Sequence, residues 1–208
     1  MKYFFSILAF VLLFSCNSSD NTPDVSGIKV ELSSRRFEQD LFKLDTANFT
    51  TNFDQLLAKY PSFGENYLSA ILNADPKWSA DSAADYVTGF ITAYKPVYDS
   101  AQKVFKDFDK YEKEIKQALQ FVKHYFPAYK DRKQIITYIG PLDGYGDILS
   151  DDAIIIGLQH HLGKSFSLYR SALVQETYPE YISNRFEPDY IPVNCMQNIM
   201  NVKSIIKR

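Results

Sequence analysis

The stretch Gln134–Gly163 decides the fold, and it reads QIITYIGPLDGYGDILSDDAIIIGLQHHLG. It contains two β-branched runs, Ile135–Ile139 and Ala153–Ile156, which are too short for free-standing helices and are typical of buried strands. A connection rich in Gly, Asp and Pro joins the two runs, and a His-His pair follows the second. We therefore expect a small sheet in this stretch, with helices packed around it.

Amphipathic patterns with a helical period fill most of the remaining chain. The clearest is Asp109–Phe126, where apolar residues line one side and charged residues line the other. Ser79 is expected to cap the helix that follows it, and Pro96 to kink or end that helix. Residues 28–34 alternate between apolar and polar side chains and predict a further strand. The predicted fold class is therefore α+β and predominantly helical, with amphipathic helices packed around a small sheet.

Composition limits the classes of function. The 208 residues suit one domain that is long enough to bury a core. The formal net charge is −2 and no cluster of Lys or Arg forms a stripe, so nucleic acid is not an expected partner. Fifteen Tyr and sixteen Phe residues fit either an aromatic core or a binding face.

The first residues predict export and lipidation. Lys2 precedes Tyr3–Phe14, an apolar run that has the length of a signal-peptide core and is too short to span a bilayer. Ser15 and Cys16 end this run in a pattern that resembles a bacterial lipobox. We expect residues 1–15 to be cleaved as a signal peptide and Cys16 to be acylated, which would anchor the chain to a membrane. The alternative is an ordinary secretory signal that contains a Cys. Cleavage removes Lys2 and changes the formal charge from −2 to −3.

Residues 16–27 form a polar segment that we expect to be a flexible tether. Ser, Asn, Asp, Pro and Gly dominate it, and such a composition buries too little apolar surface to fold. Residues 28–208 are then expected to form a single, mostly helical domain. Because the chain stops just after an apolar helical pattern, we expect this domain to be incomplete at its C-terminus. The expected location is the cell envelope, and the periplasmic and outer-membrane faces both stay open.

Cys195 is left without a partner if Cys16 carries lipid. Val193 and Met196 lie close to it, and a lone Cys among apolar residues is typical of a core position. A reactive thiol or an intermolecular disulfide is the alternative in an oxidising compartment. We expect burial.

His160 and His161 are the most obvious candidates for chemistry, because His is the commonest zinc ligand. Adjacent residues on a helix point about 100° apart, however, so both imidazoles would not easily reach one metal. The chain lacks the His-Glu-x-x-His motif of zinc peptidases, and His124 lies in a different predicted helix. The prediction is a structural or surface role for the pair, without a metal site.

Four Asp residues in the same stretch resemble a hard-cation loop by composition: Asp143, Asp147, Asp151 and Asp152. Their spacing does not match an EF-hand, and Asp and Gly also make turns and caps. Turn chemistry is therefore the favoured interpretation. The chain also lacks a G-x-S-x-G elbow, a P-loop and a G-x-G-x-x-G motif, so we predict neither catalytic residues nor a cofactor.

Tyrosines gather in the second half of the chain. They could stack on sugar rings, as in glycan-binding lipoproteins, but packing in the core or at its rim is the favoured interpretation. The residues are Tyr138, Tyr145, Tyr169, Tyr178, Tyr181 and Tyr190.

Several short motifs follow one another behind the lipobox-like segment. They are Arg36-Phe37-x-x-Asp40-Leu41-Phe42, Tyr60-Pro61-x-Phe63, Tyr125-Phe126-Pro127, Ile154-Ile155-Ile156-Gly157-Leu158, His161-Leu162-Gly163 and Tyr178-Pro179-x-Tyr181. Each motif is weak alone, but together they resemble the gliding-motility lipoprotein family called GldB, from about Ile28 to about Met200. The resemblance implies a Bacteroidetes cell-envelope lipoprotein that is needed for gliding over surfaces.

GldB-like proteins are also distantly similar to zincin-type peptidase domains, so a zincin-like fragment is an alternative description of the fold. The first functional expectation is a lipid-anchored, non-enzymatic component or scaffold of the gliding machinery. Its expected partners are the membrane, through the lipid anchor, and envelope proteins of a gliding or secretion machinery. The alternatives are a zincin-like metallohydrolase, active or degenerate, and a surface glycan-binding lipoprotein.

Overall fold

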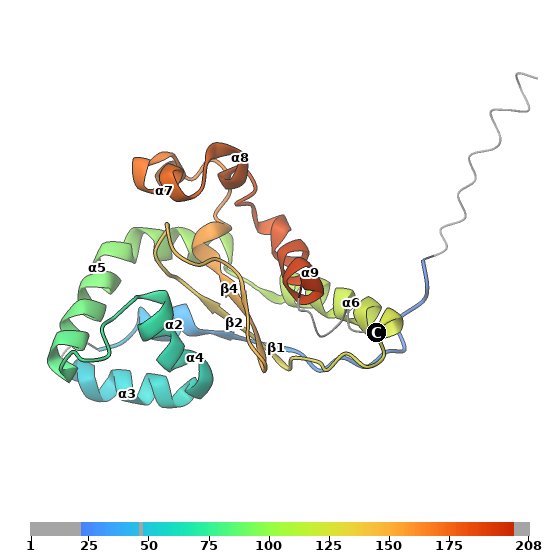
Figure 1. Cartoon of the computed structure of the whole chain (residues 1–208), viewed down its shortest axis with the longest axis horizontal. Coiled ribbons are helices and arrows are strands. Elements are labelled where there is room, and N and C mark those ends of the chain that lie inside the picture. Colours follow the sequence, from blue (N-terminus) through green and yellow to red (C-terminus); the bar gives the residue numbers. More distant parts are fainter. Residues whose placement is uncertain (1–21, 46–47, 202–208) are drawn as a thin grey trace, which may run out of the picture.

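The computed structural model describes residues 22–45 and 48–201 of the chain. Within these residues one sheet has four strands in the order β1-β2-β4-β3. They are β1 (Ser33–Arg36), β2 (Gln134–Tyr138), β3 (Ile148–Leu149) and β4 (Ala153–Gly157). β1, β2 and β4 run parallel, whereas β3 runs antiparallel to β4. Helices make up most of the rest, which confirms the predicted α+β class (Figure 1).

Helical segments fill the described chain between β1 and β2. They are α2 (Phe37–Leu41), α3 (Phe49–Lys59), α4 (Pro61–Asn66), the π-helical turn η3 (Tyr67–Ile71), α5 (Ala80–Val104) and α6 (Asp109–Tyr125). Ser79 caps α5 as predicted, because its hydroxyl accepts a hydrogen bond from the amide of Ser82 at 3.2 Å. Pro96 does not end α5, which continues beyond it.

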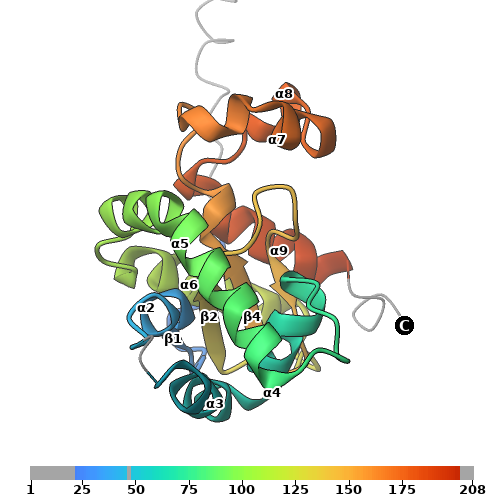
Figure 2. The same ribbon diagram turned by 90° about the vertical axis from the view of Figure 1, so that its left-hand side faces the viewer.

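Shorter helical segments follow β4. They are the 3-10 turns η4 (Leu158–His160), η5 (Ser167–Arg170) and η6 (Pro188–Tyr190), and the helices α7 (Ala172–Thr177), α8 (Glu180–Ser183) and α9 (Ile191–Asn201). Figures 1 and 2 show α3, α4 and α5 on one side of the sheet and α6 and α9 on the other. α7 and α8 stand apart, beyond one end of the strands.

The two β-branched runs form neighbouring strands at the centre of the sheet. Ile135 pairs with Ile154, and Ile136 pairs with Ile155. All of β4 is buried, as is β2 after its first residue. A parallel strand between two helical layers is buried on both faces, which explains why both runs are continuously apolar. β3 gives no signal in the sequence, because two residues are too few to show an alternating pattern.

The first strand begins later than the sequence predicts. The alternating pattern covers residues 28–34, but β1 occupies Ser33–Arg36. The difference arises because the backbone before β1 is bound by α6. Side chains of α6 donate hydrogen bonds to the carbonyls of Ile28 and Lys29, at 2.8 and 2.9 Å.

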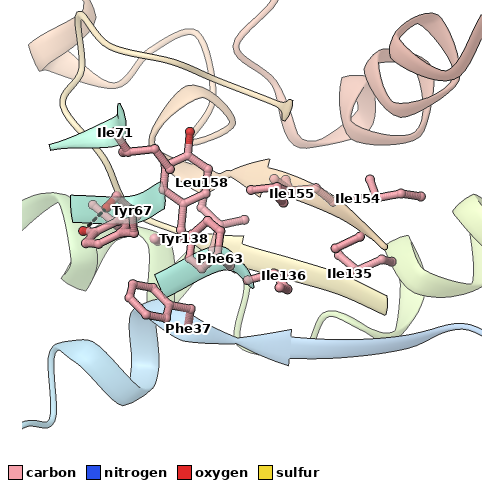
Figure 3. Packing of buried hydrophobic residues seen from close by; sticks show 14 of the residues in the cluster. Phe37, Phe63, Tyr67, Ile71, Ile135, Ile136, Tyr138, Ile154, Ile155 and Leu158 are labelled. Atoms are coloured by element: carbon pink, nitrogen blue, oxygen red, sulfur yellow. Dashed lines mark hydrogen bonds between the residues drawn. The ribbon is translucent and has the colours of Figure 1, made fainter. Parts of the chain in front are cut away.

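Aromatic residues from separate segments meet at one face of the sheet, as Figure 3 shows. Phe37 of α2 contacts Phe63 of α4 and Tyr67 of η3, with ring centroids 4.9 and 4.6 Å apart. Phe63 also packs against Tyr138 of β2. The Tyr67 hydroxyl donates to the carbonyl of Ile139 at 2.8 Å and so fastens η3 to the end of β2. Such tilted and edge-on rings stabilise a core beyond their buried area.

Packing against the domain begins before the predicted boundary at residue 28. Val25 is 5% exposed, and its carbonyl accepts a hydrogen bond from the amide of Ile28 at 2.9 Å. Residues 16–21 of the predicted tether, Cys16 among them, lie outside the described residues, and so does the predicted signal peptide. No helix among the described residues is long and apolar enough to cross a membrane.

Candidate functional site

Open α/β sheets usually bind ligands at the carboxyl ends of their parallel strands. In this sheet β2 and β4 end at Tyr138 and Gly157, and His160 and His161 follow directly. The connection between β2 and β3, residues 140–147, folds back over these strand ends. Several polar residues that stand out in the sequence are therefore brought together here.

Gln159 holds the folded-back connection through its side-chain amide. Its oxygen accepts a hydrogen bond from the amide of Gly140 at 3.1 Å, and its nitrogen donates one to the carbonyl of Tyr145 at 2.8 Å. Gln159 is buried, so both polar atoms need partners inside the protein. The side chain thus clamps the two ends of the connection.

Two tyrosine hydroxyls reinforce this clamp. The Tyr138 hydroxyl lies 2.7 Å from the carbonyls of both Tyr145 and Gly146. The Tyr178 hydroxyl donates to the carbonyl of Gly144. These bonds satisfy main-chain acceptors of the partly buried connection. The connection therefore closes the carboxyl ends of the strands.

Asp147 and His161 form a buried ion pair in this region. Both carboxylate oxygens of Asp147 lie 3.0 Å from Nε2 of His161, and the two side chains are 4% and 2% exposed. Asn194 of α9 donates to the same carboxylate at 3.1 Å, and the amide of Gly157 donates at 3.2 Å. Nδ1 of His161 donates to the carbonyl of Glu187 at 3.2 Å. The pair therefore joins the end of β4, α9 and the segment before η6.

The pKa values of both members favour the charged pair. Burial raises the pKa of the Asp147 carboxyl, but the charge and hydrogen bond of His161 and the amide of Asn194 outweigh burial and hold this pKa below its ordinary value. Burial lowers the pKa of the His161 imidazole, but attraction to Asp147 and the carbonyl of Glu187 raise it above its ordinary value. A protonated imidazole donates from both nitrogens, which matches its two acceptor partners.

His160 has a different environment from its neighbour. Its Nε2 donates to the carbonyl of Leu142 at 2.9 Å, and its ring stacks on Phe186 with centroids 4.5 Å apart. Burial lowers the pKa of His160 to about 4, because a charged imidazole would lose its hydration there. His160 is therefore neutral at neutral pH and packs as an aromatic residue.

Both histidines are buried, so the surface role is wrong and a structural role stays the prediction. His160 ends the short turn η4, and His161 follows it with both ring nitrogens engaged. In the part of the chain that the structure describes, no group of three or more His, Cys, Asp or Glu side chains is placed to hold a metal ion.

Cys195 is a free and buried thiol, which confirms the expected burial. Burial raises the pKa of this thiol well above its ordinary value, and the charge of Asp147 raises it further. The thiolate is the nucleophilic form, so a raised pKa makes the side chain unreactive at neutral pH. Cys195 therefore has the environment of a structural cysteine.

The four Asp residues of the central stretch have different surroundings. Asp152 accepts a hydrogen bond from the Ser150 hydroxyl at 2.8 Å just before β4, which matches the predicted turn chemistry. Asp151 is exposed and Asp143 is partly exposed. Asp147 departs from the prediction, because its side chain is buried and paired. No spacing along the chain indicates its contact, which exists only because the connection folds back.

The six tyrosines of the second half divide into two groups. Three are buried or partly buried, as predicted for core and rim packing: Tyr138, Tyr169 and Tyr178. Three are exposed: Tyr145, Tyr181 and Tyr190. Sugar stacking therefore stays a prediction for the exposed group alone.

A pocket of about 140 Å³ lies at the opposite, amino end of the same strands. The first residues of β2 and β4, Gln134 and Ala153, line it together with Ile136. Arg35 and Asp152 also line it and add one positive and one negative side chain. No pattern in the sequence indicates this pocket, because its residues come from β1, β2, β4, α4 and the turn before β4.

Two of the short sequence motifs contact each other directly. The Tyr60 hydroxyl donates to the carboxylate of Asp40 at 2.7 Å, and the Tyr60 ring lies edge-on to Phe37 with centroids 5.1 Å apart. Phe63 joins the same aromatic cluster. These motif residues therefore fix how α2 and α4 pack beside the sheet.

Comparison with known proteins finds one family model that matches this chain. The family model described as "Gliding motility protein GldB" matches residues 18–206, which is most of the chain. No curated protein and no solved structure matches this chain. All the described elements lie inside the matched range, so the buried ion pair and the pocket are both within it.

Proposed function

Because the chain belongs to the GldB family of gliding motility proteins, we propose that it supports gliding motility as a lipid-anchored component of the cell envelope. The observation that carries this proposal is the match over residues 18–206. Within the proposal, Cys16 carries the lipid, the host is a Bacteroidetes bacterium, and the protein is a non-enzymatic scaffold of a gliding or secretion machinery.

The closed strand ends support a scaffold over an enzyme. Catalysis needs a reactive atom that a substrate can reach. Asp147 and His161 are occupied with each other, His160 is neutral and stacked, and Cys195 is a buried thiol. This arrangement provides a fixed geometry among β4, α9 and the connection, which is what a binding scaffold requires.

The lipid anchor is tested by the substitution Cys16→Ala in cells fed an alkyne-tagged palmitate. We expect the wild-type chain in the membrane fraction with label, and the variant in the soluble periplasmic fraction without label. Cys195→Ala is the matched control, because it removes the other thiol and leaves Cys16 in place. Unchanged membrane association and labelling of Cys16→Ala would refute the anchor.

Metal analysis separates the scaffold from a zincin-like hydrolase. We expect purified protein to hold no stoichiometric zinc, and its unfolding temperature to be unaffected by zinc or by a chelator. One zinc per chain would reject the non-enzymatic proposal. A glycan array tests the remaining alternative, since specific binding that is lost in Tyr181→Ala would favour a glycan-binding lipoprotein.

The scaffold role is tested in cells. Deletion of the gene should abolish spreading of colonies on agar, and the wild-type chain should restore it. Crosslinking of intact envelopes should then recover envelope proteins with the wild-type chain that are absent from the Cys16→Ala sample. A deletion strain that spreads like its parent would overturn the gliding proposal.

A further inference from the structure

An open groove of about 540 Å³ lies where the N-terminal segment passes α6. Residues 22–26 form one side of it. The other side consists of α6 side chains, namely Lys113, Lys116, Gln117, Gln120 and Phe121. In Figure 1 the first described residues, in blue, run beside α6 at the right of the molecule. The groove is therefore the place where the chain enters the folded domain.

The entry point is held firmly on α6. Val25 is buried, and Gln120 donates a hydrogen bond to the carbonyl of Ile28 at 2.8 Å. Lys123 donates another to the carbonyl of Lys29 at 2.9 Å. The direction in which the preceding chain leaves the domain is therefore tied to the orientation of α6.

The groove has a positive charge available for binding. Lys113 and Lys116 are exposed, and neither forms an ion pair with another described residue. Asp24 is the acidic residue of the lining, and its carboxylate accepts a hydrogen bond from the amide of Ser26 at 2.9 Å. Two cationic groups and one anionic group thus face the groove.

Aromatic side chains lie on the same stripe of α6. Phe121 lines the groove and is partly exposed, and Tyr125 follows one helical turn later with 59% of its surface exposed. Residues four apart on a helix share a face. Lysines beside exposed aromatic rings are typical of surfaces that lie at the boundary between water and lipid.

The chain outside the described residues sets the distance to the lipid. Cys16 precedes Thr22 by six residues, and an extended chain of this length spans at most about 22 Å. This step rests on the acylated Cys16 of the proposed function. If Cys16 is held in the membrane, the groove lies within that distance of the phospholipid headgroups.

We propose that this face of α6 is a membrane-docking surface whose Lys113 and Lys116 bind the phosphate groups of anionic phospholipids around the anchor. The anchor keeps the groove near the membrane, and the two ammonium groups turn it toward the lipid. Each lysine close to an anionic membrane strengthens the binding of this face to that membrane about fivefold at moderate ionic strength. Docking thus fixes which sides of the domain face away from the membrane and are free for protein partners.

The test uses the full lipidated chain in vesicles. Protein purified from membranes is reconstituted into vesicles of equimolar phosphatidylglycerol and phosphatidylcholine, or of phosphatidylcholine alone. A membrane-impermeant reagent then acylates accessible lysines, which are quantified by mass spectrometry. We expect Lys113 and Lys116 to be modified about fivefold less on the anionic vesicles, and salt to remove this protection.

Lys43 and Lys77 serve as internal controls in the same sample. Both are exposed, and they lie in the α2–α3 and η3–α5 connections at the other side of Figure 1. Their modification should be equal on the two kinds of vesicle. If each of the four lysines is modified equally on the two kinds of vesicle, in protein that still floats with them, the docking surface is overturned and the anchor is left intact. Protein that fails to float would overturn the anchor itself.

Discussion

The two ends of β2 and β4 are built in opposite ways. At the carboxyl end the connection folds back, and the charges of Asp147 and His161 pair with each other out of water. At the amino end Gln134 and Ala153 line an open pocket. Open α/β sheets usually have their open side at the carboxyl end, so this molecule reverses the common arrangement. The histidines therefore lie at the end of the strands where the fold is closed.

The largest expected effect breaks the closed end. Asp147→Ala leaves the buried His161 without its partner, and the free energy of unfolding should fall by about 3–5 kcal/mol. Asp152→Ala is the matched control at the open end, because that side chain is exposed. Its free energy of unfolding should fall by no more than about 1 kcal/mol. Urea unfolding followed by circular dichroism measures both. Equal losses of stability would mean that the carboxyl end is not held together more strongly than the amino end.

The second effect is a pH dependence with opposite signs at the two histidines. The folded pKa of His160, about 4, is below its unfolded value of about 6.5, so stability falls as the pH drops between these values, by about 3 kcal/mol. The folded pKa of His161 is raised, so its contribution is present below about pH 6.5 and is lost as the pH rises through the folded value. The pKa of Asp147 is lowered, so its contribution is lost only as the pH falls below about 3.9.

The free energy of unfolding should therefore be highest near pH 6.5, and urea titrations across the pH range would measure it. His160→Phe keeps an aromatic ring beside Phe186 and removes the titrating group. This variant should flatten the decline on the acid side and leave the decline on the alkaline side. An unchanged acid-side decline would contradict the buried, neutral state of His160.

A third and smaller effect concerns how tightly the closed end is packed. A Cβ at Gly157 would lie 3.0 Å from the carbonyl oxygen of Gly146 and 3.1 Å from the Tyr138 hydroxyl. Gly157→Ala should therefore lower the free energy of unfolding by about 1–3 kcal/mol. A Cβ at Gly89 of α5 would meet nothing within 4 Å, so Gly89→Ala should raise it by about 0.5–1 kcal/mol. Thermal unfolding would show two shifts of opposite sign, and a downward shift in both would refute the difference in packing.

The smallest effect is expected in the open pocket. Ser62 lines it, and its hydroxyl reaches the carboxylate of Asp152 through an exposed bond of 3.3 Å. Ser62→Ala should change the free energy of unfolding by less than about 0.5 kcal/mol. A change as large as that of Gly157→Ala would show that contacts at the amino end contribute as much to stability as those at the closed end.

The sequence predicts those parts of the fold that depend on local signals. The central strands are readable because Ile135–Ile139 and Ala153–Ile156 are short, β-branched and apolar throughout. The cap at Ser79 is readable because capping needs only the next few residues. The start of β1 is misplaced, because α6 binds the carbonyls of Ile28 and Lys29 through contacts that no local pattern reports.

The candidate sites are harder to predict from the sequence, because they too depend on contacts between distant segments. Spacing argues against a metal shared by His160 and His161, but it does not reveal that Asp147 pairs with His161. That contact depends on the path of residues 140–147 over the strand ends. The groove on α6 likewise joins residues 22–26 to Lys113 and Lys116, which the chain separates by several helices.

The parallel pairing of β1 with β2 has a consequence for the order of events during biogenesis. Ser33 pairs with Gln134, and α2 to α6 all lie between them in the chain. Contacts between such distant segments form slowly, because a long loop must close before any pairing energy is gained. The first strand has no partner in the sheet until β2 has emerged from the ribosome. The sheet therefore cannot assemble while the second half of the chain is still being made.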